Sequence, residues 1–279
     1  MTCNLQPLLI LGSTGCVGRA LAAVWPAEVP VLWQHRSGND APPAPAIAWD
    51  ILNTAPPALP DLGGIVLLAG VTDGDPWNHN AALARSACDL AAARGLRLLI
   101  ASSQAVYGAA AGLGRGDLTE DQARATPGSY GAAKLAMEAA VADHPHADAC
   151  CLRIANVIGC DMLLKTAATG SVVLDRFADG TSPQRQYVGP VTLARVLWRL
   201  MAHDGALPPV MNIAQPGVIA MHELVDAAAV PFAWQAARAR ALPRMTLDLT
   251  RQAGLVPLPP ATPAGLIAEA RAGGWRPAP

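Results

Sequence analysis

The sequence lacks both a block of basic residues and a long apolar run. Its 20 basic residues are balanced by 21 acidic ones, and the longest apolar stretches, at 65–71 and 96–101, are too short to cross a bilayer. Nucleic acids and anionic lipids select clustered positive charge, which is missing here. No basic leader precedes the first apolar stretch either, so we expect a cytoplasmic protein with no nucleic-acid partner and no membrane association.

The cysteines and histidines form no metal or disulfide pattern. No C-x-x-C pair occurs, and His144, His146 and Asp148 lie at a predicted helix end beside Pro145 without a compact ligand set. We therefore expect no metal site, and we expect all six cysteines to be reduced and packed. The six are Cys3, Cys16, Cys88, Cys150, Cys151 and Cys160.

The rest of the composition favours an α/β core. Apolar residues make up 52% of the chain, and short apolar runs alternate with alanine-rich helical stretches, as is typical of a parallel sheet with crossover helices. The predicted strands are 8–11, 29–33, 46–49, 65–69, 96–102 and 149–153, and two predicted helices are 77–94 and 129–143. Proline clusters at 41–46 and 56–60 predict loops. The alternation fades after about residue 160, which suggests a second, smaller lobe.

The first predicted strand runs into the stretch LLILGSTGCVGRAL, in which Gly12, Gly15 and Gly18 recur at every third position. A strand, a glycine turn and a helix in that order bring backbone N–H groups and the positive end of a helix dipole to one point, where a pyrophosphate can bind. The spacing is G-x-x-G-x-x-G and not the ordinary G-x-G-x-x-G. A packing turn therefore fits this motif as well as a phosphate site does.

A second motif is SYGAAKLAME, where Tyr130 and Lys134 stand one helical turn apart and share a face. The chain has only three tyrosines and two lysines, so this spacing arises by chance in roughly two of a hundred such sequences. The lysine ammonium would lower the pKa of the phenol, and Tyr130 could then exchange a proton near neutral pH. The alternative is a surface tyrosine beside an ion pair of Lys134 with Glu138.

A third motif, LLIASSQAVYG at 98–108, ends a predicted strand with two serines. With these motifs in this order, the chain resembles the extended short-chain dehydrogenase/reductase family, the NAD(P)-dependent epimerase/dehydratase group, over nearly its whole length. The resemblance implies an α/β doubly wound parallel sheet, a Rossmann domain, at 1–160. It implies that 187–215 returns to this domain and that 161–279 forms a small substrate-binding lobe.

The resemblance assigns catalytic roles to three residues. Ser103 would hydrogen-bond the reacting oxygen, Tyr130 would be the acid/base, and Lys134 would hold the nicotinamide ribose and tune Tyr130. A polarised carbonyl needs such a donor and proton source on the side of the incoming hydride. By the same resemblance the cofactor contacts Gly12, Ser13, Thr14, Gly15, Cys16, Val17, Gly18, Arg36, Asp50, Ile51, Leu68, Ala69, Gly70, Asn80, Ser102, Tyr130, Lys134, Asn156 and Val157.

Arg36 determines the predicted cofactor. Proteins that prefer NAD normally close the second strand with an acidic residue, about 20 residues past the glycine turn, which holds the adenosine 2′-hydroxyl. Arg36 stands in that place and offers a planar cation to a 2′-phosphate. We therefore predict NADP(H) in preference to NAD(H). The alternative is an arginine that stacks on adenine or is simply solvated.

Two further segments match the family downstream. LRIANVIG places Asn156 and Val157 near nicotinamide and substrate, and QRQYVGPVTLA places Arg185 where a family arginine contacts a substrate phosphate. Asn156 and Arg185, together with Ser103, are the predicted substrate contacts, and a surface ion pair is the alternative for Arg185. The family's usual acidic residue is Thr192 here, and the lobe segment before Arg185 is short, which puts a bulky nucleotide-diphosphate substrate in doubt.

The resemblance also implies a homodimer through the helices predicted at 77–94 and 129–143. Gln104 and Ala105 stand where the family's 4,6-dehydratases carry Asp-Glu, so elimination of water lacks a local acid/base. The alternative is that a carboxylate from elsewhere, for example Asp73 or Asp75 in the loop after the fourth predicted strand, reaches the same place. We expect an NAD(P)-dependent oxidoreductase or epimerase that acts on a secondary alcohol or ketone, with a sugar or nucleotide sugar among the candidate small-molecule substrates. An NADP(H)-binding regulatory protein without turnover and a scaffold are the alternatives.

Overall fold

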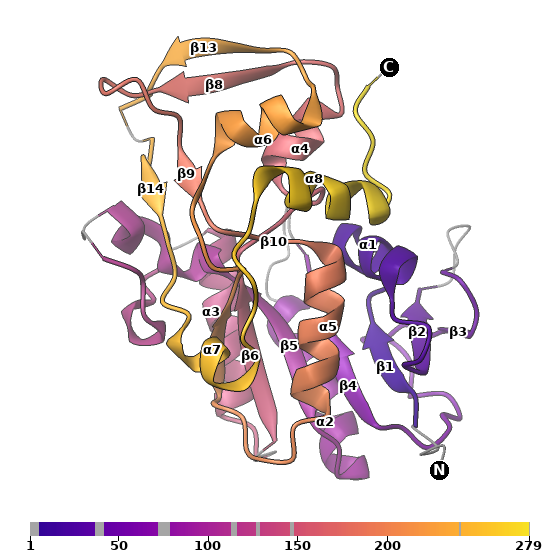
Figure 1. Ribbon diagram of the computed structural model, residues 1–279. Coiled ribbons are helices and arrows are strands. Elements are labelled where there is room, and N and C mark those ends of the chain that lie inside the picture. Colours follow the sequence, from indigo (N-terminus) through magenta and orange to yellow (C-terminus); the bar gives the residue numbers. More distant parts are fainter. Residues whose placement is uncertain are drawn as a thin grey trace.

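A seven-stranded parallel sheet forms the centre of the larger part of the molecule (Figure 1). The computed structural model describes residues 6–36, 42–71, 79–112, 116–126, 129–145, 148–239 and 241–278. In the order of the sheet, its strands are β11 (Val210–Ile213), β6 (Ala149–Ile154), β5 (Leu98–Ser103), β4 (Gly64–Leu67), β1 (Leu8–Leu11), β2 (Val31–His35) and β3 (Ala46–Ala48). Because the order reverses between β1 and β4, the carboxyl ends of these two strands form a switch point where such sheets bind ligands.

Helices cover both faces of this sheet (Figure 1). On one face lie α1 (Cys16–Val24) and α5 (Pro190–Met201), and on the other lie α2 (His79–Arg94) and α3 (Tyr130–Ala142). Successive residues of β1 are buried against opposite faces, with Leu8 and Ile10 in one core and Leu9 and Leu11 in the other. This double burial explains why the strands are continuous apolar runs and do not alternate with polar residues.

The predicted doubly wound sheet is confirmed, and all six predicted strands are present within about two residues. The strand predicted at 29–33 lies at 31–35, because Pro30 has no N–H and uses its carbonyl to accept a bond of 3.0 Å from Leu8 N. The helix predicted at 77–94 begins at His79 among the described residues. Some predictions fall partly outside the described residues. These are residues 77 and 78 of the predicted helix, residue 41 of the proline segment 41–46, and the carboxylates Asp73 and Asp75.

A smaller lobe with its own apolar core stands above the carboxyl ends of the strands (Figure 1). Its strands are β8 (Val172–Arg176), β9 (Gln184–Arg185), β12 (Ile219–Ala220), β13 (Phe232–Ala236) and β14 (Arg244–Met245), and its helices are α4 (Met162–Ala167), α6 (Met221–Ala228) and α8 (Pro263–Ala272). The pair β7 (Asn156–Val157) and β10 (Tyr187–Val188) joins the lobe to the sheet. After α5 the chain returns to the sheet as β11, and α7 (Thr250–Leu255) packs beside that strand.

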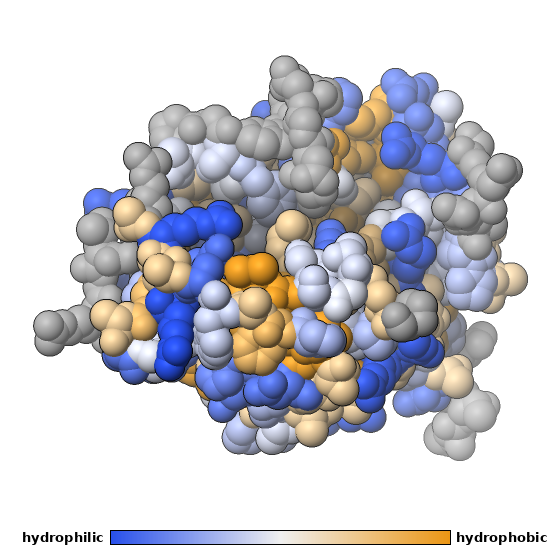
Figure 2. Space-filling model, turned by 90° about the horizontal axis from the view of Figure 1, so that it is seen from above, coloured by the Kyte–Doolittle hydropathy of each residue, from blue (hydrophilic) through white to orange (hydrophobic). Residues whose placement is uncertain are grey.

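Viewed from above the lobe, apolar residues reach the surface among hydrophilic ones (Figure 2). Among the described residues, the exposed large apolar side chains are Met162, Val173 and Trp234. In the described parts of the chain, no helix is both long enough and apolar enough to cross a membrane.

Candidate active site

The three glycines of the first motif form the turn between β1 and α1. Gly12 has a φ of +95°, and a Cβ there would lie 2.4 Å from Ala69 N. A Cβ on Gly18 would lie 2.4 Å from Gly12 O, whereas the nearest atom to a Cβ on Gly15 is 3.6 Å away. Gly12 and Gly18 are therefore needed for close packing, and Gly15 leaves the approach to α1 open. No described side chain caps the N-terminus of α1, so its first-turn N–H groups can face an anion.

A cavity of about 350 Å³ opens beside this turn, at the switch point of the sheet. The predicted cofactor residues that line it are Gly12, Thr14, Gly15, Arg36, Asp50, Ile51, Leu68, Ala69 and Gly70. The cavity, the open turn and the helix N-terminus fit the adenosine and pyrophosphate of a dinucleotide.

Gln34, at the end of β2, holds the wall of this cavity, and sequence reasoning missed it. Its Oε1 accepts a hydrogen bond of 2.8 Å from Gly12 N, and its Nε2 donates to Trp49 O. The glycine turn is thereby fixed to the segment after β3. The next residue of that segment, Asp50, accepts from Asn53 and Leu52, and these bonds lower the pKa of its carboxyl group.

Three of the predicted cofactor residues have buried polar groups that are engaged within the protein. The Ser13 hydroxyl donates to Gln34 O at 2.7 Å, and the Asn80 amide is paired with both backbone groups of Val71. Ser102 donates to Glu138 Oε1 at 2.5 Å. These side chains position the loops and strands around the cavity.

Ser103, Tyr130 and Lys134 come together where β5 ends and α3 begins. Ser129 caps α3 by accepting a hydrogen bond of 3.2 Å from Ala132 N, so Tyr130 stands in the first turn of the helix. The Ser103 side chain lies close enough to the Tyr130 hydroxyl to act on its pKa. Lys134 Nζ lies 5.9 Å from the centroid of the Tyr130 ring. A hydroxyl pair beside a buried amine can bind and protonate an oxygen atom of a substrate.

The expected lowering of the Tyr130 pKa is not found in the structure. Burial raises the pKa of Tyr130 to about 12, and the nearby Ser103 side chain offsets this only in part. The charge of Lys134 does not overcome this effect of burial: its Nζ donates to Ala101 O at 2.7 Å, and burial lowers its own pKa to about 8. Tyr130 therefore holds its proton at neutral pH and is suited to donate it.

The alternative of a surface tyrosine beside an exposed ion pair is wrong. Lys134 is 3% exposed, and Glu138 pairs with Arg153 of β6, with Nη2 and Oε2 2.7 Å apart. Only the helical spacing of Lys134 and Glu138 suggested the exposed pair, and spacing alone does not show which face of a helix is buried.

Of the predicted substrate contacts, Asn156 lies against the residue that follows Ser103, whereas Arg185 lies in β9 of the smaller lobe. Asn156 Oδ1 accepts a hydrogen bond of 2.8 Å from Gln104 Nε2. Arg185 is half-buried and donates to the backbone carbonyls of Gln184 and Leu242, and burial lowers its pKa. The arginine is thus held in place by main-chain oxygen atoms and not by a carboxylate at the surface. Val157 packs in the core next to α5.

The prediction that all cysteines are reduced is wrong for two of them. Cys16, at the start of α1, and Cys160, after β7, form a disulfide with Cα atoms 5.6 Å apart. A sequence separation of 144 residues gives no pattern from which the pair could be recognised. Cys88, Cys150 and Cys151 are free and buried as expected, and Cys3 lies outside the described residues.

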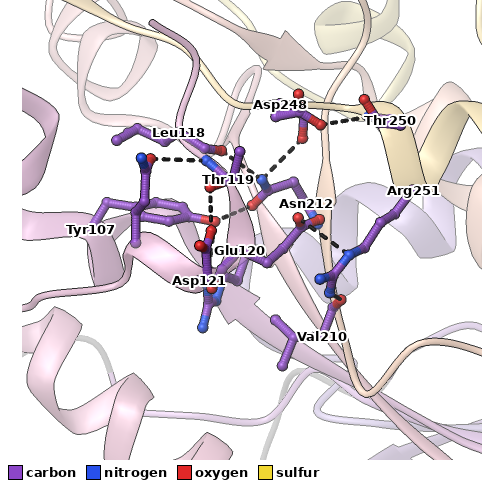
Figure 3. Close-up of polar contacts among 12 residues, drawn as sticks. Tyr107, Leu118, Thr119, Glu120, Asp121, Val210, Asn212, Asp248, Thr250 and Arg251 are labelled. Carbon is purple, nitrogen blue, oxygen red and sulfur yellow. Dashed lines mark hydrogen bonds and ion pairs between the residues drawn. The ribbon is translucent and has the colours of Figure 1, made fainter. Parts of the chain in front are cut away.

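A polar network supports the strand end that carries Ser103 (Figure 3). Tyr107, in the 3₁₀ helix η1 (Gln104–Gly112), donates to Asn212 Oδ1 at 2.5 Å. Asn212 N donates to Glu120 Oε1 at 2.9 Å, and Glu120 Oε2 lies 3.4 Å from Arg251 Nε. The network joins η1, β11 and α7, and it explains the tyrosine of the S-S-x-x-V-Y-G motif as a structural residue. Within the described ranges, no cluster of His, Cys, Asp and Glu could hold a metal; His146 lies outside them.

The fold and the site define a dinucleotide-binding enzyme of the extended short-chain dehydrogenase/reductase type. Residues 8–214 match the model of the NAD dependent epimerase/dehydratase family. The chain belongs to this family. No curated protein is similar enough in sequence to count as a match.

Solved structures share the fold over nearly the whole chain. UDP-glucose 4-epimerase from Brucella ovis in complex with NAD is 19% identical, with a TM-score of 0.77 and 98% of this chain and 99% of that chain covered. MoeE5 in complex with UDP-glucose and NAD is 21% identical, with a TM-score of 0.71 and coverage of 95% and 98%. TunA, an NAD dependent NDP-hexosamine 5,6-dehydratase, is 17% identical, with a TM-score of 0.71 and coverage of 96% and 97%.

Proposed function

We propose that the protein transfers hydride between a nicotinamide cofactor and a secondary alcohol or ketone, as a reductase or as an epimerase. The observation that carries this proposal is that the Ser103 side chain lies close to the Tyr130 hydroxyl, with Lys134 one helical turn away. The cofactor, when bound, accepts or supplies the hydride. Ser103 binds the reacting oxygen of the substrate, and Tyr130 donates its proton to that oxygen during reduction. In oxidation the same proton returns to Tyr130.

Lys134 has two tasks in this proposal. Its Nζ is anchored on Ala101 O, which leaves further N–H groups for the hydroxyls of the nicotinamide ribose. Its positive charge, which a pKa of about 8 retains at neutral pH, favours the phenolate that forms when Tyr130 has given up its proton. The cost of the buried phenolate is thereby reduced in the step where it forms.

NADP(H) is the proposed cofactor preference, although the Brucella epimerase and MoeE5 structures hold NAD. Arg36 lines the adenosine side of the cavity and follows β2 at the place where a carboxylate would hold the ribose hydroxyls. Its guanidinium is suited to a 2′-phosphate. We also propose that the glycine turn beside this cavity contacts the cofactor. Asn156 and Arg185 are the proposed contacts of the substrate.

Dehydratase activity is not part of the proposal. Gln104 and Ala105 directly follow Ser103, and neither can accept or donate a proton in general acid/base catalysis. Nucleotide hexoses remain candidate substrates for oxidation or epimerisation, since MoeE5 was solved with UDP-glucose and NAD and the Brucella structure is that of a UDP-glucose 4-epimerase. Incubation with nucleotide hexoses should yield no product lighter by one water in mass spectrometry.

A homodimer and a cytoplasmic location complete the proposal. Helices α2 and α3 pack side by side, and their outer faces carry small side chains such as Ala92, Ala136 and Ala139 that allow close helix packing. Light scattering at micromolar concentration should give the mass of a dimer.

Tyr130→Phe tests the mechanism. The variant should lose most turnover of any alcohol or ketone that the wild-type protein converts, while its affinity for NADPH stays within about twofold, because the ring remains and only the proton carrier is lost. Full activity of Tyr130→Phe would overturn the mechanism. Cofactor binding without turnover in the wild-type protein would instead favour the regulatory alternative.

A further inference from the structure

The disulfide joins the helix that follows the glycine turn to the entrance of the smaller lobe. Cys16 is the first residue of α1, and its Cα lies 5.6 Å from the Cα of Cys160. Cys160 stands between β7 and α4, where the chain leaves the sheet for the lobe. The link therefore fixes α1 to the lobe next to the proposed site of the cofactor.

A second cavity, of about 160 Å³, opens beside the disulfide. Its lining comes from α1, from the segment after β7 and from the end of α8, which lies beside α1 (Figure 1). Both Cys16 and Cys160 belong to the lining, and neither is fully buried. A small thiol can therefore reach the disulfide from solvent, whereas the free cysteines Cys88, Cys150 and Cys151 are buried.

The disulfide is one residue away from the proposed phosphate site. Gly15 lines the cavity of the proposed cofactor, and the next residue, Cys16, lines the second cavity. The backbone N–H of Cys16 belongs to the first turn of α1, which no described side chain caps. The disulfide thus holds a residue that we propose to contact the cofactor, and it ties that residue to the lobe.

We propose that the disulfide between Cys16 and Cys160 is a reversible redox site that controls the release of the dinucleotide. When it is closed, the lobe is held against α1 and a bound dinucleotide dissociates slowly. When it is reduced, the lobe and the glycine turn can separate, and dissociation is faster. Disulfides that form in the proposed cytoplasmic location are usually redox-sensing or catalytic. The inference rests on the proposed dinucleotide site but not on hydride transfer.

The reductant is a dithiol, and the reaction is a thiol–disulfide exchange. A thiolate of the dithiol attacks Cys160 Sγ, the bond between the two cysteines breaks, and Cys16 leaves as a thiolate. Negative charge is favoured at the N-terminus of α1, and Arg19 lines the same cavity, so Cys16 is the better leaving group. The second thiol of the dithiol then displaces Cys160. The protein gains two electrons and the two thiol protons, and the dithiol becomes a cyclic disulfide.

The test measures how fast a bound dinucleotide dissociates from the oxidised and from the reduced protein. The wild-type protein, oxidised in air or treated with dithiothreitol, is loaded with NADPH and mixed with excess NADP⁺, and the change in NADPH fluorescence gives the dissociation rate. Alkylation followed by peptide mass spectrometry reports the state of Cys16 and Cys160. The same measurement with NADH and NAD⁺ makes the result independent of cofactor preference. Reduction should raise the rate by about 10-fold.

Two variants separate the disulfide from other effects of the reductant. Cys160→Ser cannot form the disulfide and should release the dinucleotide at the rate of the reduced wild-type protein, with or without dithiothreitol. Cys88→Ser makes the same change at a buried free cysteine of α2 and should keep the response of the wild-type protein. Because the oxidised and reduced wild-type proteins are also compared with each other, the test does not depend on the folding of a variant.

The outcomes distinguish this inference from the proposed cofactor site. If the oxidised wild-type protein releases the dinucleotide as fast as the reduced protein, or faster, the role of the disulfide is refuted and the cofactor site stands. Free thiols at Cys16 and Cys160 after oxidation in air would refute the redox site itself. If neither NADPH nor NADH binds in either state, the proposed cofactor site fails and the inference falls with it.

Discussion

Arg153 Nη2 lies 2.7 Å from Glu138 Oε2, and both side chains are more than nine-tenths buried. The pair joins β6 to α3, and Glu138 also accepts the hydroxyl of Ser102 at the end of β5. The helix that carries Tyr130 and Lys134 is thus fixed to the two strands whose ends form the site. The ion pair therefore links the stability of the sheet to the geometry of the proposed catalytic group.

Glu138→Gln should destabilise the protein by about 3–5 kcal/mol, because it leaves the Arg153 guanidinium buried without its counter-charge. Asp89→Asn is the matched control, since Asp89 is 75% exposed and pairs with His144 at the surface; its effect should stay below about 1 kcal/mol. Urea unfolding followed by circular dichroism measures both free energies of unfolding. Equal effects of the two variants would show that the buried pair does not hold α3 in place.

The sheet could be predicted from the sequence because its strands are buried on both faces. Such strands are short, continuous apolar runs, and β1 and β4 are found directly from them. The group of Ser103, Tyr130 and Lys134 was predicted from the resemblance to a family; the structure brings the three side chains near one another, and their catalytic roles stay a prediction. The lobe was harder to predict, because β9, β12 and β14 have only two residues each and leave no periodic pattern.

Contacts between residues far apart in the sequence escaped prediction. The departure noted at Thr192 illustrates this, because Glu269 of α8 supplies the carboxylate that the returning segment lacks: Thr192 Oγ1 donates to Glu269 Oε1 at 2.7 Å. Burial explains the other incorrect prediction, that Lys134 lowers the pKa of Tyr130. A motif of Tyr130 and Lys134 gives their spacing but not the desolvation that raises the pKa of one and lowers that of the other.

The buried amine of Lys134 should make stability depend on pH. Its pKa is about 8 in the folded protein and 10.5 in the unfolded chain, so the unfolded chain holds the extra proton between these values. Stability contributed by this group therefore rises with pH through that window. Relative to Lys134→Met, the wild-type protein should gain on the order of 2 kcal/mol in unfolding free energy between pH 8 and pH 10. A difference between the two proteins that does not change with pH would contradict the burial of the charge.

The disulfide between Cys16 and Cys160 should make thermal stability depend on reductant. It closes a loop with a sequence separation of 144 residues, and loss of such a link costs roughly 2–5 kcal/mol. In differential scanning fluorimetry, dithiothreitol should lower the Tm of the air-oxidised wild-type protein. Cys160→Ser should have the lower Tm from the start and should not respond to dithiothreitol. A thiol assay first shows whether Cys16 is oxidised. If Cys16 is oxidised and dithiothreitol still leaves the Tm of the wild-type protein unchanged, the prediction is contradicted.

Arg36 should control the choice between the two cofactors. Arg36→Asp replaces the cation at the end of β2 by a carboxylate, which repels a 2′-phosphate and can accept hydrogen bonds from the two ribose hydroxyls. We expect the affinity for NADPH to fall by about 10- to 100-fold and that for NADH to rise, since a lost charge-assisted bond is worth about 1.5–3 kcal/mol. Fluorescence titration of both cofactors measures the ratio. Arg195→Asp makes the same change on the exposed side of α5, outside the cavity, and should leave the ratio unaltered. Tighter binding of NADH than of NADPH by the wild-type protein would refute the role of Arg36, and it would favour a guanidinium that stacks on the adenine ring.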